Sequence, residues 1–409
     1  MSEEIAVDSM EYDVVIVGGG PSGLSTAIKL KQLAAENNSD LSVCLIEKGS
    51  EIGAHILSGN CFEPTALNEL IPDWKEKGAP LNTPAKKDIV KFFLTEKLSL
   101  GIPFASFFAP NFNNHGNYVM SLANFCRWLA TQAENLGVEI FPGFTAAEVI
   151  YENDTVKGIL TGEMGLTKEG EKKPSYQPPM ELRAKYTIFA EGCRGHLGKK
   201  LISKYALDAN SDPQHYGIGF KEVWDVPKEV HSEGTVMHSF GWPSKSNAGS
   251  YCYHGENNQV YLGIVVPLDY SNPHISPFDE FQQWKHHKDI KKLLENGTRV
   301  AYGARALTKG GYHSRPKMTF PGGILVGCDA GLMVFTKIKG THTAMKSGML
   351  AAESAFEAIS KNRIGEDLID FEEKLKSSWI ETDLYKSRNM TALLHLSLIH
   401  ISEPTRHAS

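Results

Sequence analysis

The amino-acid sequence predicts an α/β protein in two parts: a discontinuous domain built on a parallel sheet, and a mostly antiparallel β-sheet α+β domain inserted into it. Three apolar strands that each end in a glycine turn, at residues 18–23, 190–195 and 327–331, predict the first part. Residues 210–320 are richer in tyrosine, tryptophan, histidine and alternating strands, which is typical of an antiparallel sheet. At 409 residues, the chain is long enough for two domains that share an interface.

The first glycine turn has the pattern of a Rossmann-like dinucleotide-phosphate site. Gly18 allows a sharp turn, Gly20 allows the backbone to approach a pyrophosphate, and Gly23 allows the following helix to pack closely on the strand. The pyrophosphate would lie at the positive N-terminus of that helix, which begins with Pro21 and Ser22. The alternative is a glycine turn inside an ordinary βαβ unit.

The elements around this turn can be assigned in order along the chain. A buried strand at residues 41–46 ends at Glu47, which is where such a unit places a carboxylate on the ribose hydroxyls, and Lys48 follows it. A helix is predicted over residues 121–136, because its apolar residues share one face and Ser121 can cap it. The next assignments are a strand, a hairpin and a further buried strand, at residues 138–141, 147–161 and 187–192.

The third glycine turn indicates which dinucleotide binds. FAD requires a second, widely separated turn with an aspartate, because its ribityl chain and flavin extend well beyond the pyrophosphate. Asp329 would accept a hydrogen bond from a ribityl hydroxyl. The next helix, which begins after Gly340, would direct its N-terminus at the flavin, where negative charge appears on reduction. The alternative is a generic strand–helix junction with an aspartate at the surface.

Composition and spacing narrow the remaining classes of protein. A net charge of −6 and the lack of a basic stretch exclude a nucleic-acid-binding surface. The six cysteines include no CxxC pair, which excludes the usual iron–sulfur and zinc spacings, so no metal site is expected. There is no CxxxxC motif on the first helix and no second complete GxGxxG. The electron donor is therefore a transiently bound nicotinamide or another protein. The N-terminus resembles neither a signal nor a transit peptide, and no apolar run reaches ~18 residues, so any membrane contact would be monotopic.

Seven segments of the sequence are long and peculiar to one family of proteins: residues 53–59, 69–74, 113–118, 189–193, 284–287, 301–307 and 337–348. They closely resemble electron-transfer flavoprotein:ubiquinone oxidoreductase, and the resemblance extends from about residue 11 to about residue 390. It implies a fold of the glutathione-reductase/hydroxylase-like FAD superfamily. It also implies an FAD enzyme on one leaflet of a membrane that takes electrons from a soluble electron-transfer flavoprotein and passes them to ubiquinone.

The resemblance implies a set of binding residues. A glycine pair that approaches the quinone carbonyl in the family is Ala248-Gly249 here, so only Gly249 is expected to bind the quinone. The aromatic stretch at residues 102–112 would line a quinone channel or belong to the core. The residues expected to bind FAD are Gly18, Gly20, Pro21, Ser22, Gly23, Glu47, Lys48, Gly192, Asp329, Gly340, Thr341, His342 and Thr343.

The family's membrane contact matches residues 53–74. The apolar residues of this stretch fall on one helical face, which favours insertion into a bilayer, although a buried core helix has the same pattern. Peripheral association would be with the cytoplasmic face of a bacterial inner membrane, or with the mitochondrial inner membrane if a transit peptide is missing. The side chains expected to contact lipid are Phe62, Leu67, Leu70, Ile71 and Trp74.

The sequence departs from the family in its last part. The family continues with a ferredoxin-like domain whose cysteines hold a [4Fe–4S] cluster, and this chain, without a CxxC pair, is not expected to ligate one. The expected organisation is an N-terminal tail at 1–10, an FAD-binding domain at 11–209 and 321–390 with a membrane- and quinone-proximal insertion at 53–120, an inserted ubiquinone-side domain at 210–320, and an atypical tail at 391–409.

Two other functions stay open at this point. One is a geranylgeranyl-reductase-like or hydroxylase-like flavoenzyme on the same scaffold that is reduced by NAD(P)H. The other is a non-catalytic FAD-binding fragment that docks the electron-transfer flavoprotein without turnover. No side chain can be assigned to acid–base or nucleophilic chemistry, because the chemistry would belong to the cofactor.

Overall fold

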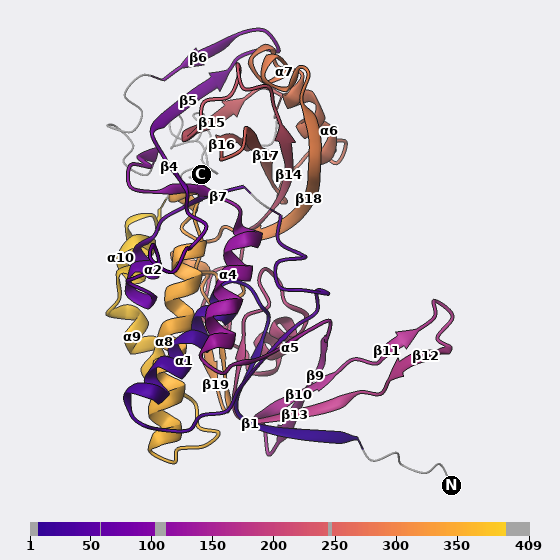
Figure 1. Cartoon of the computed structure of the whole chain (residues 1–409), viewed down its shortest axis with the longest axis vertical. Coiled ribbons are helices and arrows are strands. Elements are labelled where there is room, and N and C mark those ends of the chain that lie inside the picture. The colour runs from indigo at the N-terminus through magenta and orange to yellow at the C-terminus, as the bar shows by residue number, and fades with distance from the viewer. Residues whose placement is uncertain (1–6, 58, 103–111, 244–247, 390–409) are drawn as a thin grey trace, which may run out of the picture.

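The computed structural model describes residues 7–57, 59–102, 112–243 and 248–389. Two sheets divide the molecule along its long axis, with the parallel sheet in the lower half of Figure 1 and the antiparallel sheet in the upper half. Each sheet has its own buried core, and a third, smaller cluster of buried residues packs the upper sheet against Cys61 and Val119.

The lower, eight-stranded sheet is built from strands that lie far apart in the sequence. β1 pairs in parallel with β13 on one side and with β2 on the other, and β13 pairs in parallel with β20. Val14, Val15 and Ile16 have no exposed surface, because helices cover the sheet, and such a buried strand reads as a continuous apolar run. The strands are β1 (Asp8–Val17), β2 (Val43–Glu47), β8 (Glu139–Pro142), β9 (Ala146–Glu152), β10 (Thr155–Thr161), β13 (Met180–Phe189), β19 (Thr319–Phe320) and β20 (Gly323–Leu325).

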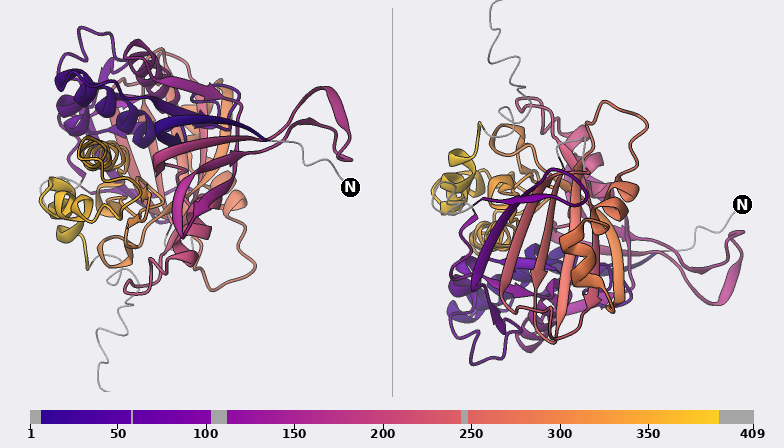
Figure 2. Two further views of the ribbon diagram at one scale, coloured as in Figure 1. Left: turned by 90° about the horizontal axis from the view of Figure 1, so that it is seen from below. Right: turned by 90° about the horizontal axis from the view of Figure 1, so that it is seen from above.

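Helices of the lower half pack side by side. The longest, α8, crosses α1 at Gly348, where a Cβ would lie 2.3 Å from the carbonyl oxygen of Ser22, so only a glycine allows this approach. The helices here are α1 (Pro21–Glu36), α2 (Thr65–Leu70), α4 (Leu122–Asn135), α5 (His196–Lys204), α8 (Thr341–Ser360), α9 (Asp370–Lys376) and α10 (Trp379–Lys386). The C-terminal helices α9 and α10 lie beside α8 in Figures 1 and 2.

The upper, seven-stranded sheet has the order β18-β14-β17-β16-β15-β5-β6. The core of this half includes Phe281 and Trp284, which lie on a helix packed on the sheet and are at most 1% exposed. The elements are β5 (Lys87–Phe93), β6 (Ser99–Gly101), β14 (Tyr216–Asp225), β15 (Thr235–Gly241), β16 (Gly249–His254), β17 (Gln259–Pro267), β18 (Thr298–Thr308), α6 (Pro277–Lys285) and α7 (Lys288–Leu294).

Short elements complete the chain. A three-stranded sheet has the order β3-β7-β4, and a separate two-stranded hairpin, β11–β12, projects from the lower half in Figures 1 and 2. Their bounds, with two 3-10 turns, are β3 (Asn60–Phe62), β4 (Thr83–Pro84), β7 (Tyr118–Met120), β11 (Met164–Leu166), β12 (Lys172–Gln177), η2 (Tyr312–Ser314) and η3 (Phe335–Lys337). Among the described residues, none lies in a helix that is both long and apolar enough to span a membrane.

Several predicted elements are confirmed. The helix predicted over 121–136 is α4, and the side chain of Ser121 accepts a hydrogen bond from the Asn124 amide at 3.3 Å as its N-cap. The predicted hairpin at 147–161 is β9–β10. The projecting β11–β12 hairpin was not predicted, because its residues are largely polar and exposed and give no apolar alternation.

Two expectations about residues 53–120 need correction. Strands β5 and β6 from this stretch belong to the upper sheet, where β5 pairs in parallel with β15. The expected lipid-facing helix is also wrong: α2 ends at Leu70, and its apolar side chains fill the core of the lower half. A stripe of apolar residues looks the same in sequence whether it faces lipid or core. The side chains concerned, each at most 5% exposed, are Phe62, Leu67, Leu70, Ile71 and Trp74.

Candidate active site

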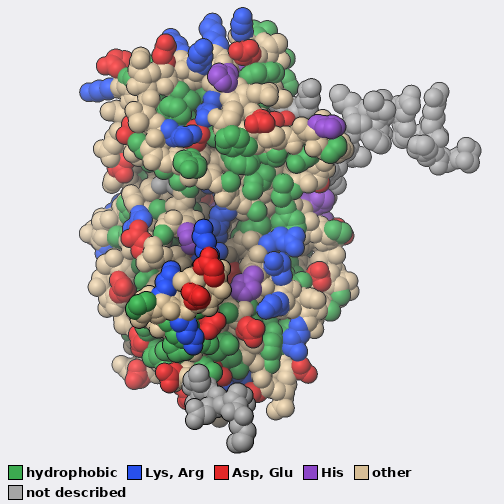
Figure 3. All heavy atoms as spheres, turned by 90° about the vertical axis from the view of Figure 1, so that its right-hand side faces the viewer, with side chains coloured by type: hydrophobic (Ala, Val, Ile, Leu, Met, Phe, Trp, Pro, Cys, Tyr) green, Lys and Arg blue, Asp and Glu red, His purple; other side chains and the backbone are tan. Residues whose placement is uncertain are grey.

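One large cavity lies where the two sheets meet. Its volume is about 1410 Å³, above the roughly 300–1,000 Å³ of most small-molecule sites, so it has room for an extended ligand. The lower wall includes the ends of β1 and β2 and the turn after β13, and the upper wall includes residues from β14, β15, β16, β17 and β18. Figure 3 shows a hollow between the two halves of the molecule on one side.

The first glycine turn lies on the lower wall with the geometry that the sequence predicts. Gly18 has a φ of +110°, and a Cβ there would lie 2.5 Å from the carbonyl oxygen of Ala190. A Cβ on Gly23 would lie 2.1 Å from the Gly18 carbonyl oxygen, because helix and strand are in close contact. A Cβ on Gly20 would meet nothing within 4 Å. Pro21 and Ser22 line the cavity beside it. The turn therefore presents open backbone and a helix N-terminus to the cavity.

Glu47 is held at the cavity wall by backbone amides. Its Oε2 accepts a hydrogen bond from the Gly19 amide at 2.9 Å, and its Oε1 accepts one from the Gly49 amide at 2.7 Å. Each carboxylate oxygen has a second lone pair, so the group can still accept hydrogen bonds from ligand hydroxyls. Lys48, next in the chain, also lines the cavity.

The two other glycine turns meet the same cavity. Gly192 lines it directly. Asp329 lies beside the cavity, and its carboxylate rests against the first turn of α5. There its Oδ1 accepts a hydrogen bond from the Gly195 amide at 3.3 Å, and its Oδ2 has no partner within the described chain. Burial and the nearby Glu191 carboxylate raise the pKa of Asp329 to about 8. Asp329 itself does not line the cavity, and its Oδ2 faces Gly198 of α5, so the expected contact with a ribityl hydroxyl stays a prediction.

Only some residues at the start of α8 face the cavity. Gly340 and Thr341 line the cavity, whereas Thr343 is buried away from it and donates a hydrogen bond to the Gly340 carbonyl at 3.0 Å. His342 also lies away from the cavity, which corrects the expectation that its side chain contacts the cofactor. Successive helical residues point in directions about 100° apart, so His342 and Thr343 face away from the cavity that Thr341 lines.

His342 belongs instead to a cluster of charged groups behind α8. Its ring stacks on Trp379 with 5.5 Å between ring centroids, and its Nε2 lies 3.8 Å from Glu63 and 3.9 Å from Asp383. These three residues bring metal-ligand atoms within 4.8 Å of one another. The Lys337 ammonium lies among them, 2.7 Å from Asp383 and 3.2 Å from Glu63, and so pairs with both carboxylates.

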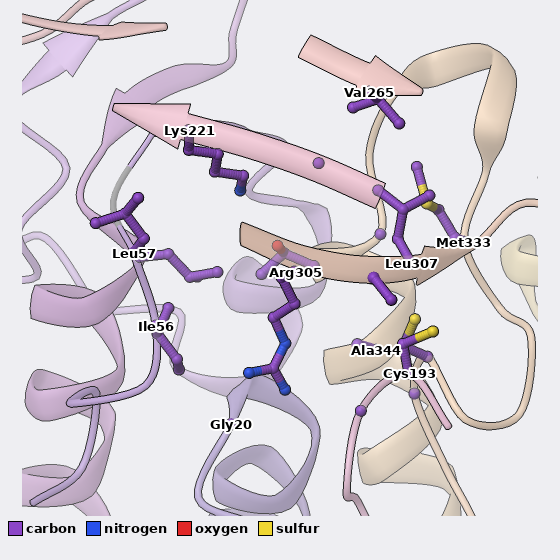
Figure 4. A pocket seen from close by; sticks show the side chains of 18 of the residues that line it. Gly20, Ile56, Leu57, Cys193, Lys221, Val265, Arg305, Leu307, Met333 and Ala344 are labelled. Atoms are coloured by element: carbon purple, nitrogen blue, oxygen red, sulfur yellow. The ribbon is translucent and has the colours of Figure 1, made fainter. Parts of the chain in front are cut away.

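The upper wall carries residues that the sequence reasoning missed. Lys221 on β14 and Arg305 on β18 point into the cavity in Figure 4. Within the described residues, no acidic side chain pairs with Lys221, and burial and the Arg305 charge lower its pKa to about 8. Each of them is a charged residue within a strand that otherwise alternates apolar residues. This interruption is the sequence signal that could have identified them as site residues.

The expected quinone-side residues lie on this wall. Gly249, the first residue of β16, lines the cavity, as does Phe112. The Phe112 ring packs edge-on against His238 and Phe240. Residues 103–111, the rest of the aromatic stretch that the sequence analysis singled out, lie outside the described residues.

Two family models match the chain. Residues 216–307 match "ETF-QO, ubiquinone-binding", and residues 16–66 match "NAD(P)-binding Rossmann-like domain". The first match runs from the start of β14 to near the end of β18, and the second contains the first glycine turn and Glu47. The first match therefore contains upper-wall residues from β14 to β18, and the second contains the part of the lower wall at β1 and β2.

Curated relatives match almost the whole chain. The electron transfer flavoprotein-ubiquinone oxidoreductase of Pseudomonas aeruginosa is 58% identical over 94% of this chain and 71% of that protein. The human mitochondrial protein of the same name is 52% identical over 94% of this chain and 64% of that protein.

Solved structures share the fold at low sequence identity. A geranylgeranyl bacteriochlorophyll reductase-like protein from Thermoplasma acidophilum has a TM-score of 0.70 at 20% identity, covering 95% of this chain and 89% of that one. The flavin-dependent brominase Bmp2 has a TM-score of 0.63 at 18% identity, covering 94% and 87%. Both likenesses concern the fold alone.

Proposed function

The chain belongs to the electron transfer flavoprotein-ubiquinone oxidoreductase family, and from this premise we propose that it holds FAD non-covalently and passes electrons from an electron transfer flavoprotein through FAD to ubiquinone. The observation that carries the proposal is the single cavity whose lower wall is the dinucleotide-type glycine turn and whose upper wall is the segment matched by the ubiquinone-binding model. When bound, FAD would supply the electron-transfer chemistry itself.

The lower wall supplies the groups that would hold FAD. The backbone at Gly20 and the N-terminus of α1 would bind the pyrophosphate, with Pro21 and Ser22 alongside, because amide groups and the helix dipole both favour negative charge there. Glu47 would accept hydrogen bonds from ribose hydroxyls. A similar N-terminus at Thr341 on α8 would lower the cost of negative charge elsewhere on the ligand.

The upper wall supplies the groups that would meet the quinone. Gly249 leaves the backbone at the start of β16 accessible, and Phe112 adds an aromatic surface. Reduction of a quinone to a quinol takes up protons, and the Lys221 ammonium, with its pKa lowered to about 8, is suited to hold and deliver one. Arg305, which points into the cavity, adds a second positive charge to this wall and so favours an electron-rich ligand.

We propose a different membrane contact from the one that the sequence suggested. The β5–β6 hairpin at the far end of the upper sheet exposes a series of large apolar side chains, which suits shallow insertion into one leaflet. A lipid-soluble quinone could then reach the upper wall from the bilayer. The exposed residues are Phe92, Leu94, Leu98, Leu100 and Ile102, each 42–53% exposed.

Localisation and domain division follow as parts of the same proposal. The relatives come from bacteria and mitochondria, so we place the chain on the surface of a bacterial or mitochondrial inner membrane. The FAD-binding domain comprises 11–209 and 321–390, and the ubiquinone-side domain comprises 210–320 with strands from 87–101 added to its sheet. Because no CxxC pair occurs among its six cysteines, we propose that the chain does not ligate a [4Fe–4S] cluster.

An absorbance spectrum followed by anaerobic titration tests this function. The purified chain should show a flavin spectrum, release FAD on denaturation, and be reoxidised by a soluble ubiquinone analogue after reduction. Reduced electron transfer flavoprotein should be tried as the donor, with NADH and NADPH as controls. Release of FMN or NAD in place of FAD, or reduction by NAD(P)H at turnover rates, would contradict the proposal.

A further inference from the structure

Two of the six cysteines lie together on the cavity wall. Cys193 and Cys328 both line the cavity, and their thiols interact directly with each other. They are also the two cysteines that are partly exposed, whereas the other four are buried. Figure 4 shows the Cys193 sulfur close to Ala344 in the first turn of α8.

The strand register explains why these distant residues meet. β13 and β20 are neighbouring parallel strands in which Phe189 is the partner of Leu325. Adjacent strands lie about 4.8 Å apart. Cys193 and Cys328 follow these two partners by only a few residues and lie in the glycine turns at the carboxyl ends of the two strands. The thiols are thus brought together by the fold, whereas in the sequence they are far apart.

The surroundings of the pair favour a reactive thiolate on one sulfur. The Thr308 hydroxyl oxygen lies 3.3 Å from the Cys328 sulfur. Hydrogen bonds from Cys193 and Thr308, with the positive charge of Arg305, lower the pKa of Cys328 to about 6, and the same pairing raises the pKa of Cys193. The thiolate is the nucleophilic form of cysteine, so Cys328 would react first and Cys193 second.

We propose that Cys193 and Cys328 form a reversible disulfide that clips together the two glycine turns at the cavity, with hydrogen peroxide as the oxidant. The Cys328 thiolate attacks one oxygen of the peroxide, which breaks the O–O bond and yields a sulfenic acid and, after protonation, water. The Cys193 sulfur then attacks the sulfenic sulfur, the S–S bond forms, and a second water leaves. In total, two thiols and one peroxide give one disulfide and two waters. A small dithiol reverses the step by thiol–disulfide exchange.

The cross-link would constrain the floor of the cavity. It joins the turn that contains Gly192 to the turn that precedes Asp329, and a disulfide requires an S–S distance of about 2.05 Å. The pair lies in no CxxC or CxxxxC motif, so sequence inspection gives no sign of it. Formation of the cross-link does not depend on the proposed electron transfer, because it needs only peroxide and the two thiols.

Peptide mapping of the full chain tests the proposal. The purified flavin-loaded protein is treated with a small excess of hydrogen peroxide, alkylated and digested without reductant. We expect a peptide pair linked through Cys193 and Cys328, an intact mass lower by two hydrogen atoms, and full recovery of both thiols after dithiothreitol. At least half of the chains should carry the link before any buried cysteine is modified.

Variants make the result specific. Cys193→Ser and Cys328→Ser should each abolish the link, and Cys193→Ser should leave Cys328 to proceed to sulfinic acid. Cys252→Ser, at a cysteine buried in the core of the upper half, is the matched control and should retain the link. If Cys252→Ser does not fold, Cys126→Ser replaces it. Absence of the linked peptide while Cys328 is irreversibly oxidised in the unmodified sequence, or an equal yield of links to other cysteines, would overturn the proposal.

Discussion

At the scale of single residues, Lys221 shows how a cavity can lower the stability of the fold that forms it. The ammonium faces the cavity without an acidic partner in the described chain, and its pKa is lowered from 10.5 to about 8. Between these values the unfolded chain binds more protons than the folded one, so stability rises with pH in that interval. Below about pH 8 both states are protonated, and the full cost of burying the charge remains.

Lys221→Met should therefore stabilise the fold at neutral pH. We expect the free energy of unfolding at pH 7 to rise by roughly 1–3 kcal/mol, and this gain to shrink as the pH rises above 8 towards 10.5. Urea denaturation at pH 7 and pH 9.5 measures both values. Lys285→Met is the control: Lys285 pairs with the buried Glu222 at 2.9 Å, so its removal should destabilise the protein. An equal gain in the free energy of unfolding at both pH values would contradict the lowered pKa of Lys221.

Substitutions at two glycines of the first turn should affect different properties, one FAD binding and the other the stability of the fold. A Cβ on Gly20 meets no atom within 4 Å and projects towards the cavity, whereas a Cβ on Gly23 would clash with the Gly18 carbonyl. Gly20→Ala should leave the free energy of unfolding within about 0.5 kcal/mol and weaken FAD binding at least tenfold. Gly23→Ala should lower stability by roughly 1–3 kcal/mol. Flavin fluorescence titration and urea denaturation report the two quantities. Unchanged FAD affinity in Gly20→Ala would show that the pyrophosphate does not bind at this turn.

At the scale of elements, the β5–β6 hairpin takes the proposed role of membrane contact in place of α2, which lies within the residues 53–74 that the sequence suggested. Both carry apolar side chains, but α2 packs into the lower core and the hairpin leaves its side chains exposed at the end of the molecule. Burial of one large apolar side chain contributes roughly 1.5–3 kcal/mol, so a few exposed leucines could hold a protein on a bilayer. A charged residue in place of an apolar one should therefore weaken membrane binding in the hairpin but destabilise the fold in α2.

Charged substitutions in the hairpin should release the chain from membranes. We expect Leu98→Glu with Leu100→Glu to lower partitioning into phosphatidylcholine vesicles at least tenfold without loss of bound flavin. Leu70→Glu should unfold the protein, because that side chain is 2% exposed. The control is Ile369→Glu, at an exposed side chain in the lower half, and it should change neither property. Unchanged vesicle binding in the double variant would place the membrane contact elsewhere.

The elements that could be predicted are the ones defined by local signals. The glycine turn at Gly18, the capped helix at Ser121 and the β9–β10 hairpin depend on residues that are close in sequence. The pairing of β5 with β15 could not be predicted, because it joins Lys87 to Thr235 and carries no local signal. The same limit applies to the site: Glu47 follows from spacing, whereas the meeting of Cys193 and Cys328 follows from strand order.

At the scale of the whole molecule, the chain forms both walls of the cavity, but its cysteines lack the spacing that holds an iron–sulfur cluster. The resemblance found in the sequence implies an iron–sulfur cluster that shares in electron transfer from the protein donor. We therefore expect a flavin spectrum without a broad iron–sulfur shoulder and no stoichiometric iron by metal analysis. Small dyes and quinone analogues should exchange electrons readily with the flavin, and electron transfer flavoprotein should reduce the flavin more slowly than they do in stopped-flow mixing. Native-like rates with the protein donor would show that the flavin suffices.

The topology of the lower sheet also has a consequence during synthesis. β1 lies between β2 and β13, and the partner of Val14 on β13 is Tyr186, so the central strand leaves the ribosome long before one of its neighbours exists. At roughly 5–20 residues per second, the delay is on the order of 10–30 s. Pairings between such distant segments also slow folding once they can begin. For that interval the apolar run around Val14 has one unpaired edge, and such an edge is prone to aggregate in a nascent chain.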